Sequence, residues 1–187
     1  MKVVPNIISL FRICLVPVFI IVYFTDESDI KINAVFVYAV AAFSDFLDGF
    51  LARKFEVSSN LGKLLDPLGD KLMTFSVLLC LTIRGPLPFW AVLVVGIKEV
   101  IMAIGGIVLH KKAHVELLPS NLAGKASTVV FFLVCATLLL FRDIPRGVAI
   151  ALISFAIGLA FLALVSYFRT YTMLMKSNDS TNSKLGI

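Results

Sequence analysis

The sequence has few charged residues, and this deficit excludes a typical soluble domain. Aspartate, glutamate, lysine and arginine make up 16% of its 187 residues, whereas hydrophobic residues make up 59%. A soluble domain has about 25% charged and about 45–50% apolar residues. Because several apolar runs are long enough to cross a bilayer, the sequence predicts an integral membrane protein.

Cysteine is also scarce, and no nucleic-acid-binding motif is present. The three cysteines, Cys14, Cys80 and Cys135, lie in apolar segments, so we expect small hydrophobic side chains and no disulfide. The basic residues flank apolar segments instead of forming a patch with aromatics, which argues against a nucleic-acid partner. We expect no cleavable signal, because Arg12 interrupts the first apolar segment and no small-residue cleavage site follows it.

The apolar runs predict an all-α fold, a bundle of six transmembrane helices. The expected spans are residues 5–24, 32–55, 61–83, 89–109, 124–141 and 147–171. We expect one catalytic domain over residues 1–175, without internal repeats. A polar tail over residues 176–187 is expected to be disordered.

Four carboxylates interrupt this apolar pattern. Asp45 and Asp48 are three residues apart, and Asp66 and Asp70 are four apart, so each pair lies on one face of a helix. Ionised carboxylates at membrane depth are costly unless they are paired or bound to metal. Oxygen ligands of this kind suit a hard cation, and four negative charges would balance two divalent ions, Mg²⁺ or Mn²⁺.

The residues around these acids resemble the signature of the CDP-alcohol phosphotransferases, integral membrane enzymes of phospholipid synthesis. The pattern is Asp-x2-Asp-Gly-x2-Ala-Arg-x8-Gly-x3-Asp-x3-Asp. Every position of it is filled at the family spacing, by Asp45, Asp48, Gly49, Ala52, Arg53, Gly62, Asp66 and Asp70. The start of the chain also resembles bacterial phosphatidylglycerophosphate synthases, a subgroup of this family.

The resemblance implies a reaction and assigns roles to these residues. A CDP-linked lipid, here CDP-diacylglycerol, would donate its phosphatidyl group to an acceptor hydroxyl and release CMP. The four aspartates would hold the two metal ions, and Asp70 would also act as the general base. The residues that would line the CDP-lipid pocket are Gly49, Ala52, Arg53, Gly62, Asn6, Ser9 and Arg12. For Arg12, a side chain that snorkels to the membrane interface stays an alternative.

The acceptor is predicted from charged residues after the motif. Lys98, Glu99, His110 and Lys125 are candidates to bind glycerol 3-phosphate, whose dianionic phosphate needs additional cations. Lys98 and Glu99 are alternatively a structural ion pair. Phosphatidylglycerophosphate synthases usually have Arg-Glu at this place, and lysine lacks the bidentate fork of arginine. A cardiolipin synthase that uses phosphatidylglycerol as acceptor is therefore the alternative within the family.

Lysine and arginine predict the orientation in the membrane. They gather on the side that holds both termini and the acidic motif, whereas the other side has Lys31, Arg84, Arg142 and Arg146. By the positive-inside rule, both termini and the active site face the cytoplasm from a plasma-membrane bundle. The resemblance further implies a homodimer. A divalent-cation transporter is the alternative from another class, but it does not explain Gly49, Ala52, Arg53 and Gly62 at fixed spacing.

Overall fold

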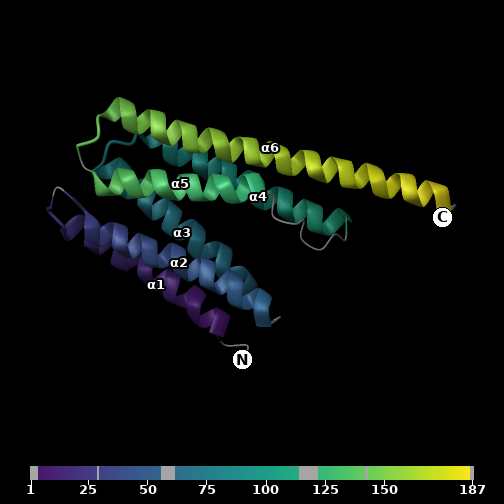
Figure 1. The fold of residues 1–187 in the computed structure, drawn as a ribbon, viewed down its shortest axis with the longest axis horizontal. Coiled ribbons are helices and arrows are strands. Elements are labelled where there is room, and N and C mark those ends of the chain that lie inside the picture. The colour runs from purple at the N-terminus through teal and green to yellow at the C-terminus, as the bar shows by residue number, and fades with distance from the viewer. Residues whose placement is uncertain (1–3, 29, 56–61, 114–121, 142, 186–187) are drawn as a thin grey trace. The chain divides into compact units, whose positions relative to one another are not determined.

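The protein is mainly helical in the backbone that a computed structural model describes, which comprises residues 4–28, 30–55, 62–113, 122–141 and 143–185. Side chains are described for residues 10–28, 30–47, 68–102, 124–141 and 143–166. The helices are α1 (Val4–Thr25), α2 (Ile32–Phe55), α3 (Gly62–Ile83), α4 (Phe89–Ala113), α5 (Leu122–Leu140) and α6 (Arg146–Leu185) (Figure 1). The predicted all-α class is confirmed.

The helix bounds follow the predicted spans closely, with one clear exception at the C-terminus. Helix α2 has the predicted bounds, and α3 begins one residue later than expected. Helix α6 continues to Leu185, so the prediction of a disordered tail over residues 176–187 was wrong for residues 176–185. The polar composition of this segment misled the prediction, because no glycine or proline interrupts the helix between Gly158 and Gly186.

The chain divides into two compact units, each of which is described by itself. The first comprises residues 1–92 and 135–150, and the second comprises residues 93–134 and 151–187. The first unit contains α1, α2 and α3, which carry the predicted acidic motif. The single domain expected over residues 1–175 stays a prediction.

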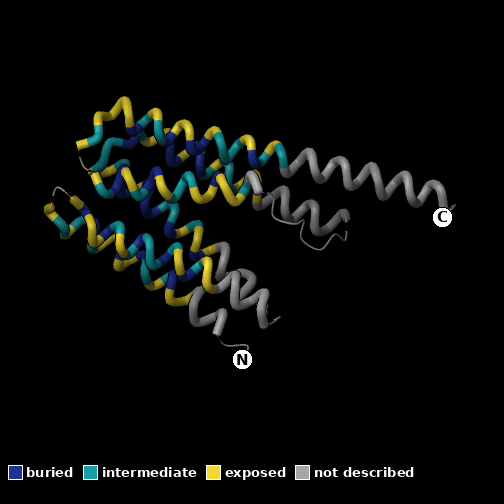
Figure 2. The backbone as a smooth tube through the Cα atoms, viewed as in Figure 1, coloured by how far each residue is buried: buried dark blue, intermediate teal, exposed yellow. Residues whose placement is uncertain are grey.

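In the first unit, α1 packs against both α2 and α3. The buried stripe of α1 includes Val16, Phe19 and Tyr23, which recur at helical spacing. The ring of Phe19 lies 6.1 Å from that of Tyr23 and 6.3 Å from that of Tyr38 on α2, between ring centroids. Figure 2 shows how buried and exposed residues alternate along these helices. This packing fixes the rotation of α1 about its own axis, and with it the direction of Arg12.

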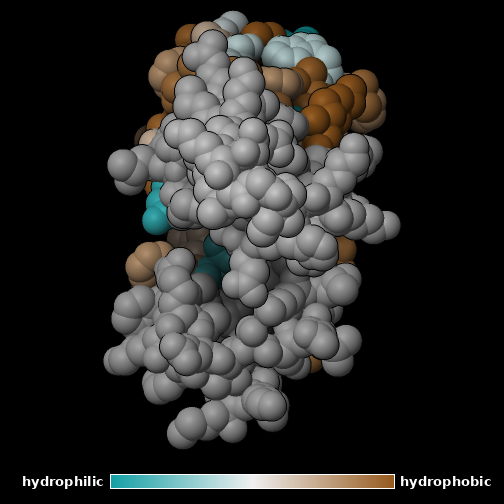
Figure 3. All heavy atoms as spheres, turned by 90° about the vertical axis from the view of Figure 1, so that its right-hand side faces the viewer, coloured by the Kyte–Doolittle hydropathy of each residue, from teal (hydrophilic) through white to brown (hydrophobic). Residues whose placement is uncertain are grey.

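Apolar side chains are also exposed on the described helices. Among the described residues, one stretch is long and apolar enough to cross a membrane, Arg146–Ser166, and shorter apolar stretches cover Leu10–Thr25, Ile32–Leu47 and Gly124–Leu140. Large exposed side chains include Phe36, Phe46 and Leu162. The described side chains visible in Figure 3 are mainly hydrophobic. Such a surface suits contact with lipid chains.

Candidate active site

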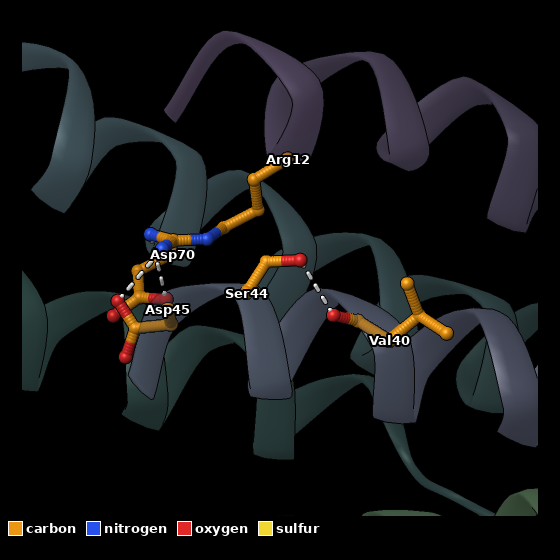
Figure 4. A network of polar contacts seen from close by, with 5 residues as sticks. All are labelled: Arg12, Val40, Ser44, Asp45 and Asp70. Atoms are coloured by element: carbon orange, nitrogen blue, oxygen red, sulfur yellow. Dashed lines mark hydrogen bonds and ion pairs between the residues drawn. The ribbon is translucent and has the colours of Figure 1, made fainter. Parts of the chain in front are cut away.

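The candidate site is a cluster of one arginine and two aspartates from three different helices. Arg12 Nη2 lies 2.9 Å from Asp45 Oδ1, and Arg12 Nη1 lies 3.5 Å from Asp70 Oδ1 (Figure 4). Arg12 comes from α1, Asp45 from α2 and Asp70 from α3. The first and last acids of the predicted motif, 25 positions apart in the sequence, therefore meet at a single guanidinium group.

The members of this cluster differ sharply in exposure. The side chain of Arg12 is 1% exposed, whereas those of Asp45 and Asp70 are 41% and 56% exposed. The guanidinium is thus enclosed by the helices, while both carboxylates remain open on their outer side. A substrate or a cation can reach the acids without unfolding any part of the site.

Helical periodicity explains why these residues converge. Each charged residue continues the buried stripe of its own helix, one turn away from a buried apolar residue. The pairs are Arg12 with Val16, Asp45 with Ala41, and Asp70 with Met73. Because residues three or four apart share a helix face, the stripes that pack α1 against α2 and α3 also bring the charges together. The alternative of a snorkelling Arg12 was wrong, because the side chain is buried.

Gly69 lies beside the stem of Arg12, a neighbour that the sequence prediction missed. A Cβ atom at Gly69 would lie 3.4 Å from Arg12 Cδ and 3.5 Å from Ile13 Cγ1. The stem of Arg12 therefore runs close to the backbone of α3, where a Cβ would just make van der Waals contact and a larger side chain would collide. Its signal in the sequence was its position directly before Asp70.

Ser44 borders the site without joining the charge cluster. Its hydroxyl donates a hydrogen bond of 2.8 Å to the carbonyl oxygen of Val40, one turn earlier on α2 (Figure 4). This local bond satisfies a buried polar group within its own helix. The ion pair of Asp45 with Arg12 is thus separate from the hydrogen bond of this neighbouring hydroxyl.

Two of the four predicted metal ligands have described side chains. Asp48 lies in α2 one turn after Asp45, and Asp66 lies in α3 one turn before Asp70, but both side chains are outside the described part. Among the side chains that are described, no group of three or more potential metal ligands occurs. Asp45 and Asp70 supply only oxygen ligands, which is the chemistry that Mg²⁺ and Mn²⁺ prefer.

The other predicted donor-binding residues lie on the same three helices. Their backbone positions are helical, and their side chains are outside the described residues. They are Asn6 and Ser9 in α1, Gly49, Ala52 and Arg53 in α2, and Gly62 in α3.

The predicted acceptor-binding residues belong to the second unit. Lys98 Nζ lies 2.6 Å from Glu99 Oε1, so these neighbours on α4 form an ion pair. Lys125 is exposed in the first turn of α5, and the side chain of His110 lies outside the described part. The structure thus brings Lys98 and Glu99 together, as in the structural alternative, and leaves a role in acceptor binding as a prediction.

Comparisons with known proteins agree with the resemblance seen in the motif. The sequence is 31% identical to the CDP-diacylglycerol–glycerol-3-phosphate 3-phosphatidyltransferase of Wigglesworthia glossinidia brevipalpis, over 88% of this chain and 92% of that protein. It is 32% identical to the Bacillus subtilis protein of the same name, over 73% and 76%. It is also 36% identical to the cardiolipin synthase (CMP-forming) of Streptomyces coelicolor, over 67% and 59%.

The match to the family extends far beyond the acidic motif. A sequence model of the CDP-alcohol phosphatidyltransferases matches residues 2–171, which include all the predicted site residues and parts of all six described helices. The chain belongs to the CDP-alcohol phosphatidyltransferase family.

Proposed function

We propose that this protein transfers the phosphatidyl group of CDP-diacylglycerol to glycerol 3-phosphate, giving phosphatidylglycerophosphate and CMP. The observation that carries the proposal is the convergence of Asp45 and Asp70 on Arg12, since both acids belong to the family signature. The names of the Wigglesworthia and Bacillus relatives support the same donor and acceptor.

Asp70 is proposed as the general base. Its carboxylate is open on one side and held by Arg12 on the other, so a hydroxyl of the acceptor can approach it. Asp70 takes the hydroxyl proton, the hydroxyl oxygen forms a bond to the phosphatidyl phosphorus, and the bond from that phosphorus to the CMP oxygen breaks. General-base catalysis of this kind typically contributes about 10²–10⁴-fold to the rate.

The carboxylates are proposed to hold two divalent cations, Mg²⁺ or Mn²⁺. The described donors fit this assignment, because Asp45 and Asp70 offer hard oxygen ligands on adjacent helices with open outer sides. Asp48 and Asp66 would complete the ligand set. When bound, such ions offset the negative charge of a diphosphate and of its transition state.

The membrane arrangement is part of the proposal. Six transmembrane spans, with both termini and the site on the cytoplasmic side of the plasma membrane, are supported by apolar helices and by the distribution of lysine and arginine. A homodimer in contact with membrane lipids is proposed from the family resemblance.

A cardiolipin synthase remains the second candidate. The ion pair of Lys98 with Glu99 favours it, because a lysine that is engaged by a neighbouring acid attracts a free phosphate less strongly. The Streptomyces relative also carries that name. For this candidate the acceptor would be phosphatidylglycerol, and the chemistry at Asp70 would be unchanged.

The test is an acceptor panel with detergent-solubilised protein and CDP-diacylglycerol, in which both CMP and the lipid product are measured. We expect phosphatidylglycerophosphate with glycerol 3-phosphate, loss of turnover with EDTA, and recovery with Mg²⁺ or Mn²⁺. Cardiolipin formed only from phosphatidylglycerol would move the assignment to the second candidate. Cation flux without CMP release would instead support a transporter.

A further inference from the structure

Arg12 occupies the same carboxylate oxygens that the proposed function assigns to cations. Its two terminal nitrogens reach Oδ1 of Asp45 and Oδ1 of Asp70, at 2.9 and 3.5 Å. One positive charge thus lies between two negative charges on different helices. A carboxylate oxygen in contact with a guanidinium is electrostatically a weaker ligand for a divalent cation.

Packing holds Arg12 in this place. The side chain is 1% exposed, and its stem passes over Gly69, where a Cβ atom would touch it. A charge this deeply enclosed is costly unless it is paired, so the arginine and the acids stabilise one another. The acids, by contrast, are open to the outside. A cation can therefore approach from the open side while Arg12 remains behind the carboxylates.

We infer that Arg12 is a built-in counter-ion that keeps Asp45 and Asp70 together in the metal-free protein and competes with the divalent cation for them. This inference rests on the proposed function, which supplies the cation. Arg12 acts as a positioning residue, because it works through the two aspartates. The competition sets cation affinity below the value that the carboxylates alone would give.

The inference makes opposite predictions for stability and for affinity. Arg12→Gln removes the positive charge, so the metal-free protein should melt at a lower temperature because two carboxylates then repel each other across the helices. The same change should tighten cation binding by about tenfold or more, because the positive charge of Arg12, a few ångströms from the cation, no longer repels it. A residue that only assembled the site would show weaker binding and lower stability together.

The experiment measures Mn²⁺ binding to the full chain in detergent, without substrate, by electron paramagnetic resonance, together with thermal unfolding in chelator. Arg12→Lys keeps the positive charge but lacks the two terminal nitrogens of a guanidinium. The Mn²⁺ affinity of this variant should stay within about threefold of wild type. The matched control is Arg84→Gln, which removes an arginine that donates to the carbonyl oxygen of Phe24, at the carboxyl end of α1 and away from Asp45 and Asp70. Its Mn²⁺ affinity should equal that of wild type.

Each outcome bears on a different claim. If wild-type protein binds no Mn²⁺, the proposed cation site fails, and the inference fails with it. If wild type binds but Arg12→Gln binds equally or more weakly, the counter-ion role is wrong while the proposed function stands. Should Arg12→Gln unfold in chelator, it is prepared with Mg²⁺: unfolding that is reversed by the cation supports the inference, and failure to fold with excess Mg²⁺ overturns it.

Discussion

Along the part of α1 whose side chains are described, charged groups are engaged at two places, and the two are built differently. Within the helix, Arg12 points at the carboxylates of Asp45 and Asp70. At its carboxyl end, Lys31 and Arg84 donate instead to backbone carbonyl oxygens. The two places are about 16 Å apart along the helix axis, at a rise of about 1.5 Å per residue.

At the carboxyl end, the cations satisfy carbonyl groups that the helix leaves without partners. Lys31 Nζ donates to the carbonyl oxygens of Tyr23, at 3.0 Å, and of Asp26, and it lies over the Tyr23 ring. Arg84 Nη1 donates to the carbonyl oxygen of Phe24 at 2.9 Å. Cations at this end of a helix also interact favourably with its dipole.

The loop beside this end carries acids as well. A pocket of about 300 Å³ is lined by Asp26, Glu27, Lys31 and Arg84. Hydrogen bonds from Ser28 lower the pKa of the Asp26 carboxyl, so that group stays ionised. The acids and the cations of this pocket therefore balance, and the cations are engaged by the backbone.

The difference separates a structural use of charge from a functional one. Lys31 is buried and donates to carbonyl oxygens, which no ligand needs to reach. Arg12 is also buried but holds acids that face outward. Substitutions of Lys31 or Arg84 should thus change stability alone, whereas substitutions of Arg12 or its two acids should also change activity.

The largest effect is expected at Asp70. Asp70→Asn keeps the size of the side chain but removes its ability to accept a proton, so kcat for CMP release should fall by about 10²–10⁴-fold. The melting temperature should fall only slightly, because Asp70 is half exposed and Arg12 keeps its closer partner Asp45 at 2.9 Å. Normal turnover of this variant would show that Asp70 is not the base. Glu27→Gln, at an exposed acid in the loop after α1, is the matched control and should keep full activity.

A smaller effect is expected at Gly69. Gly69→Leu places a side chain where the stem of Arg12 now runs, so the arginine must shift away from the acids. Overpacking of this kind typically lowers the free energy of unfolding by about 1–3 kcal/mol. Thermal unfolding and CMP release should both decrease. Gly158→Leu, at a glycine whose Cβ would have no neighbour within 4 Å, serves as the control; an equal loss there would remove the special role of Gly69.

The smallest effect on activity is expected at Lys31. Lys31→Met keeps the apolar stem but leaves the carbonyl groups of Tyr23 and Asp26 without this donor, which should cost about 1–3 kcal/mol of stability. Turnover per folded molecule should be unchanged, as measured by CMP release normalised to the folded fraction. A large fall in kcat at unchanged stability would erase the distinction between the two places on α1.

The sequence predicted the helices better than it predicted their contacts. The bounds of α2 were predicted correctly because an apolar run ends in polar residues on both sides. The helical spacing of Asp45 and Asp48 was also evident. Periodicity, however, shows which residues share a face, not which faces meet. The sequence therefore allowed the Arg12 side chain either to line the site or to snorkel to the membrane interface. The packing of α1 against α2 and α3 decided between the two.

The remaining differences have local physical causes. Gly69 was missed because its role appears only when a side chain from another helix crosses it. Lys98 and Glu99 are consecutive and so point in different directions along α4, yet their long side chains still meet. The C-terminal segment was expected to be disordered from its polarity, although nothing in it breaks a helix.

The most direct test compares Arg12, which belongs to α1, with Arg84, which donates to a carbonyl oxygen at the carboxyl end of α1. Arg12→Gln and Arg84→Gln are made in the same background, and kcat for CMP release and the melting temperature are measured for each. The account predicts that Arg12→Gln lowers kcat by about 10²-fold, as for loss of a group that positions catalytic charge, whereas Arg84→Gln lowers only the melting temperature. Equal losses of kcat, or full activity of Arg12→Gln, would contradict the assignment of the Arg12, Asp45 and Asp70 cluster as the active site.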